Sequence, residues 1–181
     1  MHFKKDPQQI LADAERIYSA REIDRAFDRM AVQIEKDLAT EMPVVLAVMN
    51  GGVFAAVELC QRFDFAYEFD YVHLSRYGHE LTGGDITWRV SLSEHLAGRS
   101  VLIVDDVLDR GATLAELYEA LDRCGVHSRK CAVLVKKNLK SDIQRPEVHY
   151  VGVETGDEYI FGCGMDYAGF WRGLPELYVV R

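Results

Sequence analysis

The feature that most constrains the fold is a buried strand that runs directly into an acidic turn and then into a helix. Residues 101–104 are four consecutive apolar residues, mostly β-branched, which is typical of a strand covered on both faces. Two aspartates follow at once, and residues 105–113, here named the acidic turn, lead into leucines at helical spacing. A strand followed so closely by a helix is the unit of an α/β fold with a parallel sheet.

Other apolar patterns extend this unit along the chain. Strands are predicted at 44–49, 65–71, 87–92, 101–104, 132–135, 148–153, 159–161 and 177–180. Helices are predicted over about 7–40, 53–62 and from 114 to near Gly125, where apolar residues recur at helical spacing. The polar, glycine-containing segment 76–85 predicts a mobile loop. We therefore expect one α/β domain with a mostly parallel sheet flanked by helices.

Charge and composition argue against several functional classes. The net charge of −8 gives no electrostatic support for binding nucleic acid. No apolar run approaches the roughly 20 residues of a membrane helix, and residues 1–14 lack the apolar stretch of a signal peptide. The four cysteines and six histidines follow no metal-ligand spacing. We expect a cytoplasmic protein without a nucleic-acid or membrane partner.

The acidic turn has the chemistry of a sugar-phosphate site. Ligands of open α/β sheets bind beyond the carboxyl ends of the strands, where the following helix offers unpaired N–H groups to a phosphate. Gly111 would let the backbone approach that phosphate, and Thr113 would add a hydroxyl donor. Asp105 and Asp106 would then accept hydrogen bonds from ribose hydroxyls.

Two other interpretations of the acidic turn compete with this one. An acidic pair after a buried strand also occurs in receiver domains, where it holds magnesium near a phosphorylated aspartate. That interpretation needs an aspartate at the end of another strand, and none of the other continuous apolar strands ends in one. The simplest alternative is a solvated acidic turn without a ligand, since short motifs produce false positives.

Residues 101–114 resemble the phosphoribosyl-pyrophosphate signature of type I phosphoribosyltransferases. That signature consists of an apolar strand, two acidic residues and then the pattern acid-x-Gly-x-Thr. Residues 44–52 are similar to the pyrophosphate loop of that family, and residues 76–85 to its flexible catalytic loop. Lys136 stands where purine-specific members keep a lysine. Residues 159–167, followed by Arg172, resemble the C-terminal stretch of the hypoxanthine-guanine members. The resemblance thus runs from about residue 43 to the C-terminus.

The resemblance implies a fold and a reaction. The fold would be a single Rossmann-like phosphoribosyltransferase domain over residues 1–181, with a core at about 41–140 and a small hood from about 1–40 and 155–181. The reaction would transfer the 5-phosphoribosyl group of phosphoribosyl pyrophosphate to N9 of hypoxanthine or guanine. The products would be pyrophosphate and either IMP or GMP. The cofactor would be Mg²⁺, and the metabolic role would be purine salvage. A homodimer or homotetramer is expected.

The resemblance also implies a role for each site residue. Asp109 would be the catalytic base beside purine N7. The phosphoribosyl group would be bound by Asp105, Asp106, Asp109, Arg110, Gly111, Ala112 and Thr113. Pyrophosphate would be bound by Asn50, Gly51 and Arg172, and the purine by Lys136, Tyr159, Ile160 and Asp166. Arg76 and Tyr77 would belong to the flexible loop, and magnesium would lie near Asp166, Asp105 and Asp106.

Three positions depart from the family pattern. Arg110 stands where threonine is frequent, Ala112 where lysine is frequent, and Asn50 where a basic residue is common. The non-proline cis peptide of the family would fall at Met49–Asn50.

Each assigned residue also has a simpler interpretation. Lys136 could be a solvated surface charge beside Lys137, and Tyr159 an ordinary half-buried strand aromatic. Asp166 and Arg172 could pair with each other across a turn, which contributes little when exposed.

The competing function is regulatory, because some proteins of this fold sense phosphoribosyl pyrophosphate and control transcription or bind RNA. Such a protein needs a basic surface or an added DNA-binding segment, and the acidic chain counts against it.

Overall fold

Two β-sheets organise the chain in the computed structural model, which describes residues 6–76, 86–140 and 143–180. The larger has six strands in the order β4-β3-β2-β5-β6-β7. These are β2 (Val44–Val48), β3 (Glu68–Arg76), β4 (Ile86–Val90), β5 (Ser100–Leu108), β6 (Ser128–Lys137) and β7 (Tyr150–Thr155). All neighbours run parallel except β3 and β4, which are antiparallel. The predicted α/β class with a mostly parallel sheet is confirmed.

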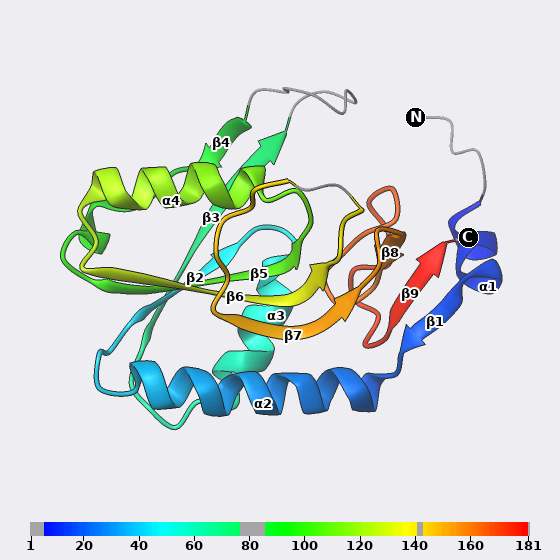
Figure 1. The fold of residues 1–181 in the computed structure, drawn as a ribbon, viewed down its shortest axis with the longest axis horizontal. Coiled ribbons are helices and arrows are strands. Elements are labelled where there is room, and N and C mark those ends of the chain that lie inside the picture. The colour runs from blue at the N-terminus through cyan, green and yellow to red at the C-terminus, as the bar shows by residue number, and fades with distance from the viewer. Residues whose placement is uncertain (1–5, 77–85, 141–142, 181) are drawn as a thin grey trace.

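Helices cover both faces of this sheet (Figure 1). Helix α4 (Ala112–Cys124) lies on one face, and α2 (Ala20–Leu38) and α3 (Gly52–Cys60) lie on the other. Strand β5 contributes Ile103 to the apolar core beneath α4 and Leu102 to the core beneath α2 and α3. Because β5 is buried on both faces, its sequence is continuously apolar rather than alternating.

Glycines mark the limits of α4. The helix begins after Gly111, at φ 79°, and ends at Gly125, at φ 75°, both in the left-handed region. The Gly125 N–H donates to the carbonyls of Leu121 and Asp122, so glycine closes the last turn without strain from a side chain. The predicted end of this helix near Gly125 is confirmed.

A second, antiparallel sheet joins the two ends of the chain in the order β1-β9-β8. Its strands are β1 (Glu15–Tyr18), β8 (Tyr159–Phe161) and β9 (Leu177–Val180), and α1 (Pro7–Asp13) precedes it. β1 pairs directly with β9, so segments near the two ends of the described chain lie side by side (Figure 1).

The prediction that residues 7–40 are helical is wrong at β1. Arg16 pairs with Tyr178 of β9, a partner that local periodicity cannot reveal. Ser19 then starts α2 through a capping box with Glu22, whose carboxylate accepts from the Ser19 N–H at 2.9 Å. Within the predicted hood region, β1 belongs to the small sheet, whereas α2 packs on the large one.

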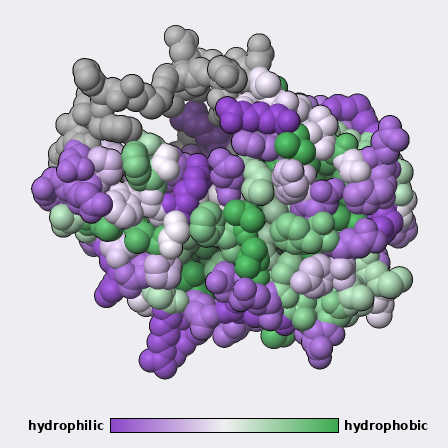
Figure 2. All heavy atoms as spheres, turned by 180° about the vertical axis from the view of Figure 1, so that it is seen from behind, coloured by the Kyte–Doolittle hydropathy of each residue, from purple (hydrophilic) through white to green (hydrophobic). Residues whose placement is uncertain are grey.

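The surface is mostly polar but carries an apolar area. Figure 2, the face behind that of Figure 1, shows apolar side chains gathered near the centre and charged ones around them. Large exposed apolar residues include Phe54 and Val57 on α3, and Phe69 and Tyr71 on β3. Among the described residues, no helix combines the length and the apolar character needed to cross a bilayer. A short 3₁₀ helix, η1 (Glu94–Leu96), precedes β5.

Candidate active site

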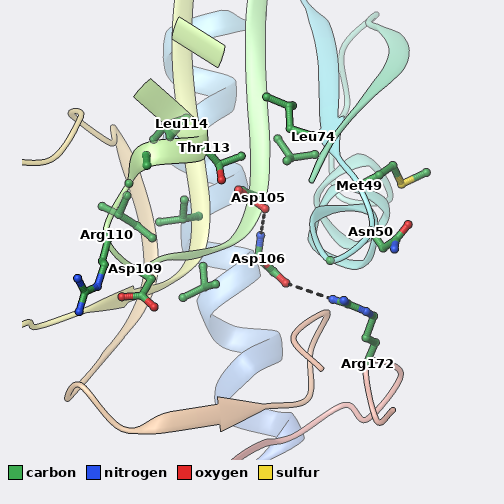
Figure 3. A pocket seen from close by; sticks show the side chains of 17 residues that line it. Met49, Asn50, Leu74, Asp105, Asp106, Asp109, Arg110, Thr113, Leu114 and Arg172 are labelled. Atoms are coloured by element: carbon green, nitrogen blue, oxygen red, sulfur yellow. Dashed lines mark hydrogen bonds and ion pairs between the residues drawn. The ribbon is translucent and has the colours of Figure 1, made fainter. Parts of the chain in front are cut away.

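A cavity of about 300 Å³ opens at the carboxyl ends of β2 and β5. It is lined by residues 48–51 and 105–114, together with Leu74, Val133 and Arg172 (Figure 3). The turn after β2, the acidic turn, whose first four residues belong to the end of β5, and the C-terminal region therefore meet in one place. This is the position at which open parallel sheets bind ligands.

The N-terminus of α4 forms one wall of the cavity. Gly111 caps the helix without a side-chain hydrogen bond, and Ala115 N–H donates to the Gly111 carbonyl at 2.9 Å. The N–H groups of the first turn precede that bond and lie at the positive end of the helix dipole. Ala112 and Thr113 from this turn line the cavity. The wall is suited to a phosphate group.

Two adjacent carboxylates lie at the base of the cavity. Asp106 is only 9% exposed, and its N–H donates to Asp105 Oδ1 at 2.9 Å. Burial and the neighbouring charge of Asp106 raise the pKa of Asp105 well above its usual value. Burial also raises the pKa of Asp106, against the effects of its contacts with Asp105 and Arg172. Such a pair favours ligands that donate hydrogen bonds or carry positive charge.

The backbone of the turn after β2 lies against this acidic pair. A Cβ on Gly51 would overlap the Asp106 carboxylate, and one on Gly164 would come within 2.5 Å of the Gly51 carbonyl. Only glycine allows three chain segments to pack this closely. The Met49–Asn50 peptide preceding Gly51 is cis, as the resemblance implies.

Arg172 links the C-terminal region to the cavity. Its Nη1 donates to the Gly164 carbonyl at 2.7 Å and lies 4.0 Å from Asp106 Oδ2. Its Nη2 lies 2.5 Å from Asp166 Oδ1. Asp166 and Arg172 therefore form the ion pair across a turn that the simpler interpretation of these residues predicts. The same guanidinium also lines the cavity, whereas Asp166 does not.

Asp109 lines the cavity and pairs with Lys137, a residue to which the sequence analysis assigned no role. Lys137 Nζ lies 3.6 Å from Asp109 Oδ2, and the Lys137 side chain is only 11% exposed. Lys136 does not line the cavity; its Nζ lies 3.8 Å from Glu154 Oε1. Adjacent strand residues point to opposite faces, so the two lysines have different partners. Neither of them lines the cavity.

The other predicted residues lie at the edge of the site or away from it. Tyr159 is half-exposed and donates its hydroxyl to the Asp166 carbonyl at 3.0 Å, while Ile160 is buried in the core. Arg110 is exposed and extends away from the acidic pair (Figure 3). Arg76 ends β3, and Tyr77 lies outside the described residues. Asn50 and Ala112, the other departures from the pattern, both line the cavity.

The fold is that of an α/β protein with a mostly parallel sheet. Its cavity combines an acidic turn with a helix N-terminus, which is the arrangement of a phosphate-binding site. A family model then narrows the class. The model of the phosphoribosyl transferase domain matches residues 13–168, and the chain belongs to this family.

Several known proteins are similar over nearly the whole chain. The hypoxanthine-guanine-xanthine phosphoribosyltransferase of Tritrichomonas foetus is 28% identical over 95% of this chain and 94% of its own length. The hypoxanthine-guanine phosphoribosyltransferase of Streptococcus pyogenes is 29% identical over 98% and 96%. A hypoxanthine phosphoribosyltransferase from Staphylococcus aureus superimposes with a TM-score of 0.87 at 24% identity, over 98% of this chain and 97% of its own, and shows the fold alone.

Proposed function

We propose that this protein is a purine salvage enzyme that transfers the 5-phosphoribosyl group of phosphoribosyl pyrophosphate to N9 of hypoxanthine or guanine. The products are IMP or GMP and pyrophosphate. The observation that carries the proposal is the cavity in which Asp105, Asp106, Asp109, the N-terminus of α4 and Arg172 meet. The similar proteins from T. foetus and S. pyogenes, which bear the names of purine phosphoribosyltransferases, support the choice of base.

Different walls of the cavity bind different groups of the donor substrate. The first-turn N–H groups of α4 and the Thr113 hydroxyl bind the 5′-phosphate. Asp105 and Asp106 accept hydrogen bonds from the ribose hydroxyls. The backbone at Asn50 and Gly51 holds the pyrophosphate together with the Arg172 side chain. Among the described residues that line the cavity, the arginines are Arg172 and Arg110. Arg110 faces solvent and contributes its backbone.

The base binds between the acidic turn and the small sheet. Lys136 donates to purine O6, and Tyr159 stacks on the ring while Ile160 shapes the pocket from within the core. The bond from ribose C1 to pyrophosphate breaks as the N9 lone pair attacks C1 with inversion. Asp109 accepts the proton from N7, which prevents positive charge from remaining on the base.

The carboxylates of the site fit a hard divalent cation. Magnesium prefers oxygen ligands and is commonly held by one or two carboxylates together with the phosphates of its substrate. In the described part of the chain no cluster of three or more His, Cys, Asp or Glu side chains could hold a metal alone, which agrees with a largely substrate-held ion. Asp105, Asp106 and Asp166 would hold the ion together with the substrate. When bound, Mg²⁺ neutralises the leaving pyrophosphate.

The organisation of the molecule completes the proposal. We assign the chain to one domain, with a core built on the six-stranded sheet and a hood from the two ends of the chain. The protein associates into a homodimer or homotetramer, and the exposed apolar side chains of Phe54, Val57, Phe69 and Tyr71 are candidates for the interface. The enzyme acts in the cytoplasm on small molecules.

One assay tests this function directly. Purified protein is incubated with phosphoribosyl pyrophosphate, Mg²⁺ and hypoxanthine, guanine, xanthine or adenine, and pyrophosphate and nucleotide are both measured. We expect turnover with hypoxanthine and guanine that is lost with excess EDTA and restored by Mg²⁺. Full turnover in EDTA contradicts the metal requirement. Binding of phosphoribosyl pyrophosphate without turnover of any base favours the regulatory alternative.

A further inference from the structure

A short segment before β7 lies against the outer side of the acidic turn. This segment, residues 145–147, is here named the strap. Nη1 of Arg145 donates to two backbone carbonyls, that of Asp109 at 3.2 Å and that of Lys137 at 2.7 Å. Both acceptors are partly buried. One guanidinium nitrogen thus joins the acidic turn to the carboxyl end of β6.

The rest of the strap continues this contact. A Cβ on Gly111 would lie 2.8 Å from Pro146 Cδ and 3.5 Å from Arg145 Cβ, so the strap packs directly on the residue that caps α4. The Tyr118 hydroxyl of α4 donates to the Glu147 carbonyl at 2.6 Å. The strap is therefore fastened to the acidic turn, to β6 and to α4.

Arg145 fixes the backbones of two residues whose side chains also meet. Asp109 and Lys137 form an ion pair at 3.6 Å. The Asp109 side chain is 49% exposed, so few neighbours hold it in place. Its position in the cavity consequently depends on where its own backbone is held.

From these contacts we propose that Arg145 is a positioning residue for phosphoribosyl transfer, which holds Asp109 and the phosphate-binding turn in register. The inference rests on the proposed function. Arg145 is not among the residues that line the cavity, so we expect it to act without touching the substrates. Its effect is exerted through the Asp109 carbonyl, because a base misplaced by a fraction of an ångström loses much of its effect on rate.

A second arginine supplies a matched control. Arg29 on α2 also donates to two backbone carbonyls, those of Arg25 and Gly152, each at 3.1 Å. Neither acceptor lines the cavity. Arg29→Ala therefore removes the same number of charged hydrogen bonds to backbone without affecting the acidic turn.

The test measures kcat, KM and Tm for the parent, Arg145→Ala and Arg29→Ala. We expect Arg145→Ala to lower kcat by on the order of 10- to 100-fold while KM for hypoxanthine changes by less than about threefold. Added guanidinium ion, far below denaturing concentrations, should restore part of that kcat. Arg29→Ala should keep its kcat and show no response to guanidinium. Arg145→Lys, which can remake one of the two bonds, should be intermediate.

Several results would overturn the inference. An unchanged kcat in Arg145→Ala would overturn it. A loss of activity that is proportional to the fall in Tm in both alanine variants, and that guanidinium does not rescue, would also overturn it. If Arg145→Ala does not fold, Arg145→Lys is compared in its place and must show a smaller but measurable fall in kcat at nearly constant KM. A parent that turns over no base overturns the proposed function and this inference with it, whereas an active parent with an unaffected variant overturns only the inference.

Discussion

A Cβ atom on Gly51 would overlap the Asp106 carboxylate, because the turn after β2 lies directly against that side chain. Gly51 follows β2 and Asp106 lies in β5, and the carboxyl ends of these two neighbouring parallel strands meet at the cavity. This contact joins the turn proposed to bind pyrophosphate to the acids proposed to bind ribose.

Gly51→Ala should therefore damage both stability and activity. The added methyl group has no space, and overpacking of this kind costs about 1–3 kcal/mol. For a chain of this size that corresponds to a fall in Tm of roughly 2–12 °C, at about 2–4 °C per kcal/mol. Gly173→Ala is the control, since the nearest atom to its Cβ would be 3.9 Å away. A Gly51→Ala protein with parental Tm and kcat would contradict the packing described.

Asp109→Asn tests the proposed catalytic base. Asparagine keeps the shape of the side chain but cannot take a proton from N7, so kcat should fall by about 10²–10⁴-fold. Binding of phosphoribosyl pyrophosphate, measured by calorimetry, should change little. Asp122→Asn, which alters an aspartate paired with Arg129 outside the cavity, should leave kcat unaffected. A kcat within a few-fold of the parent would show that Asp109 is not the base.

Lys136→Met tests base choice. Lysine has three donors and no acceptor, so it matches the O6 of hypoxanthine and opposes the amino group of adenine. Loss of this bond should lower kcat/KM for hypoxanthine by about 10- to 150-fold, from about 1.5–3 kcal/mol, and leave adenine use unchanged or slightly improved. Lys130→Met, at the other end of β6 and paired with Asp37, is the control. An undiminished preference for hypoxanthine would make Lys136 a surface lysine.

Asp105→Asn should stabilise the protein at neutral pH. The pKa of Asp105 is raised in the folded state by burial and by the charge of Asp106, so ionisation opposes folding. Stability is lost in the parent as pH rises through this raised pKa. The variant should therefore have the higher Tm at pH 8, and the difference should close as pH falls below about 3.9, the ordinary aspartate value.

Asp122→Asn is the control for this pH series and has the opposite sign. Its hydrogen bond with Arg129 lowers the pKa of Asp122, so ionisation favours folding. The variant should have the lower Tm at pH 8, by a small amount because the pair is exposed, and the difference should vanish in acid. A Tm difference for Asp105→Asn that is independent of pH would contradict the assigned cause.

Much of the site could be predicted because it is local in sequence. The buried strand 101–104, the two aspartates after it and the glycine and threonine before a helix are contiguous, and their patterning alone places them at a strand-to-helix junction. β5, the acidic turn and α4 have this arrangement in the structure. The pattern of the acidic turn also matches that of a known family, which no periodicity could provide.

What the sequence could not supply depends on contacts between distant residues. Residues 15–18 are helical by periodicity but form β1, because β9 offers backbone partners about 160 positions later. Lys136 and Lys137 are the same type of residue and differ in the face of β6 on which each lies. Lys137 is the more buried of the two and contacts Asp109, whereas Lys136 contacts Glu154.

Arg145 shows the same limit at a single residue. Nothing in its local sequence distinguishes it from a surface arginine, and its two acceptors lie 36 and 8 positions away. The sequence by itself determined the α/β pattern and the chemistry of the acidic turn, because hydrophobic periodicity and turn residues act over a few positions. Tertiary structure alone decided which side chains meet at the cavity, since that depends on strand pairing and on the packing of segments far apart in the chain.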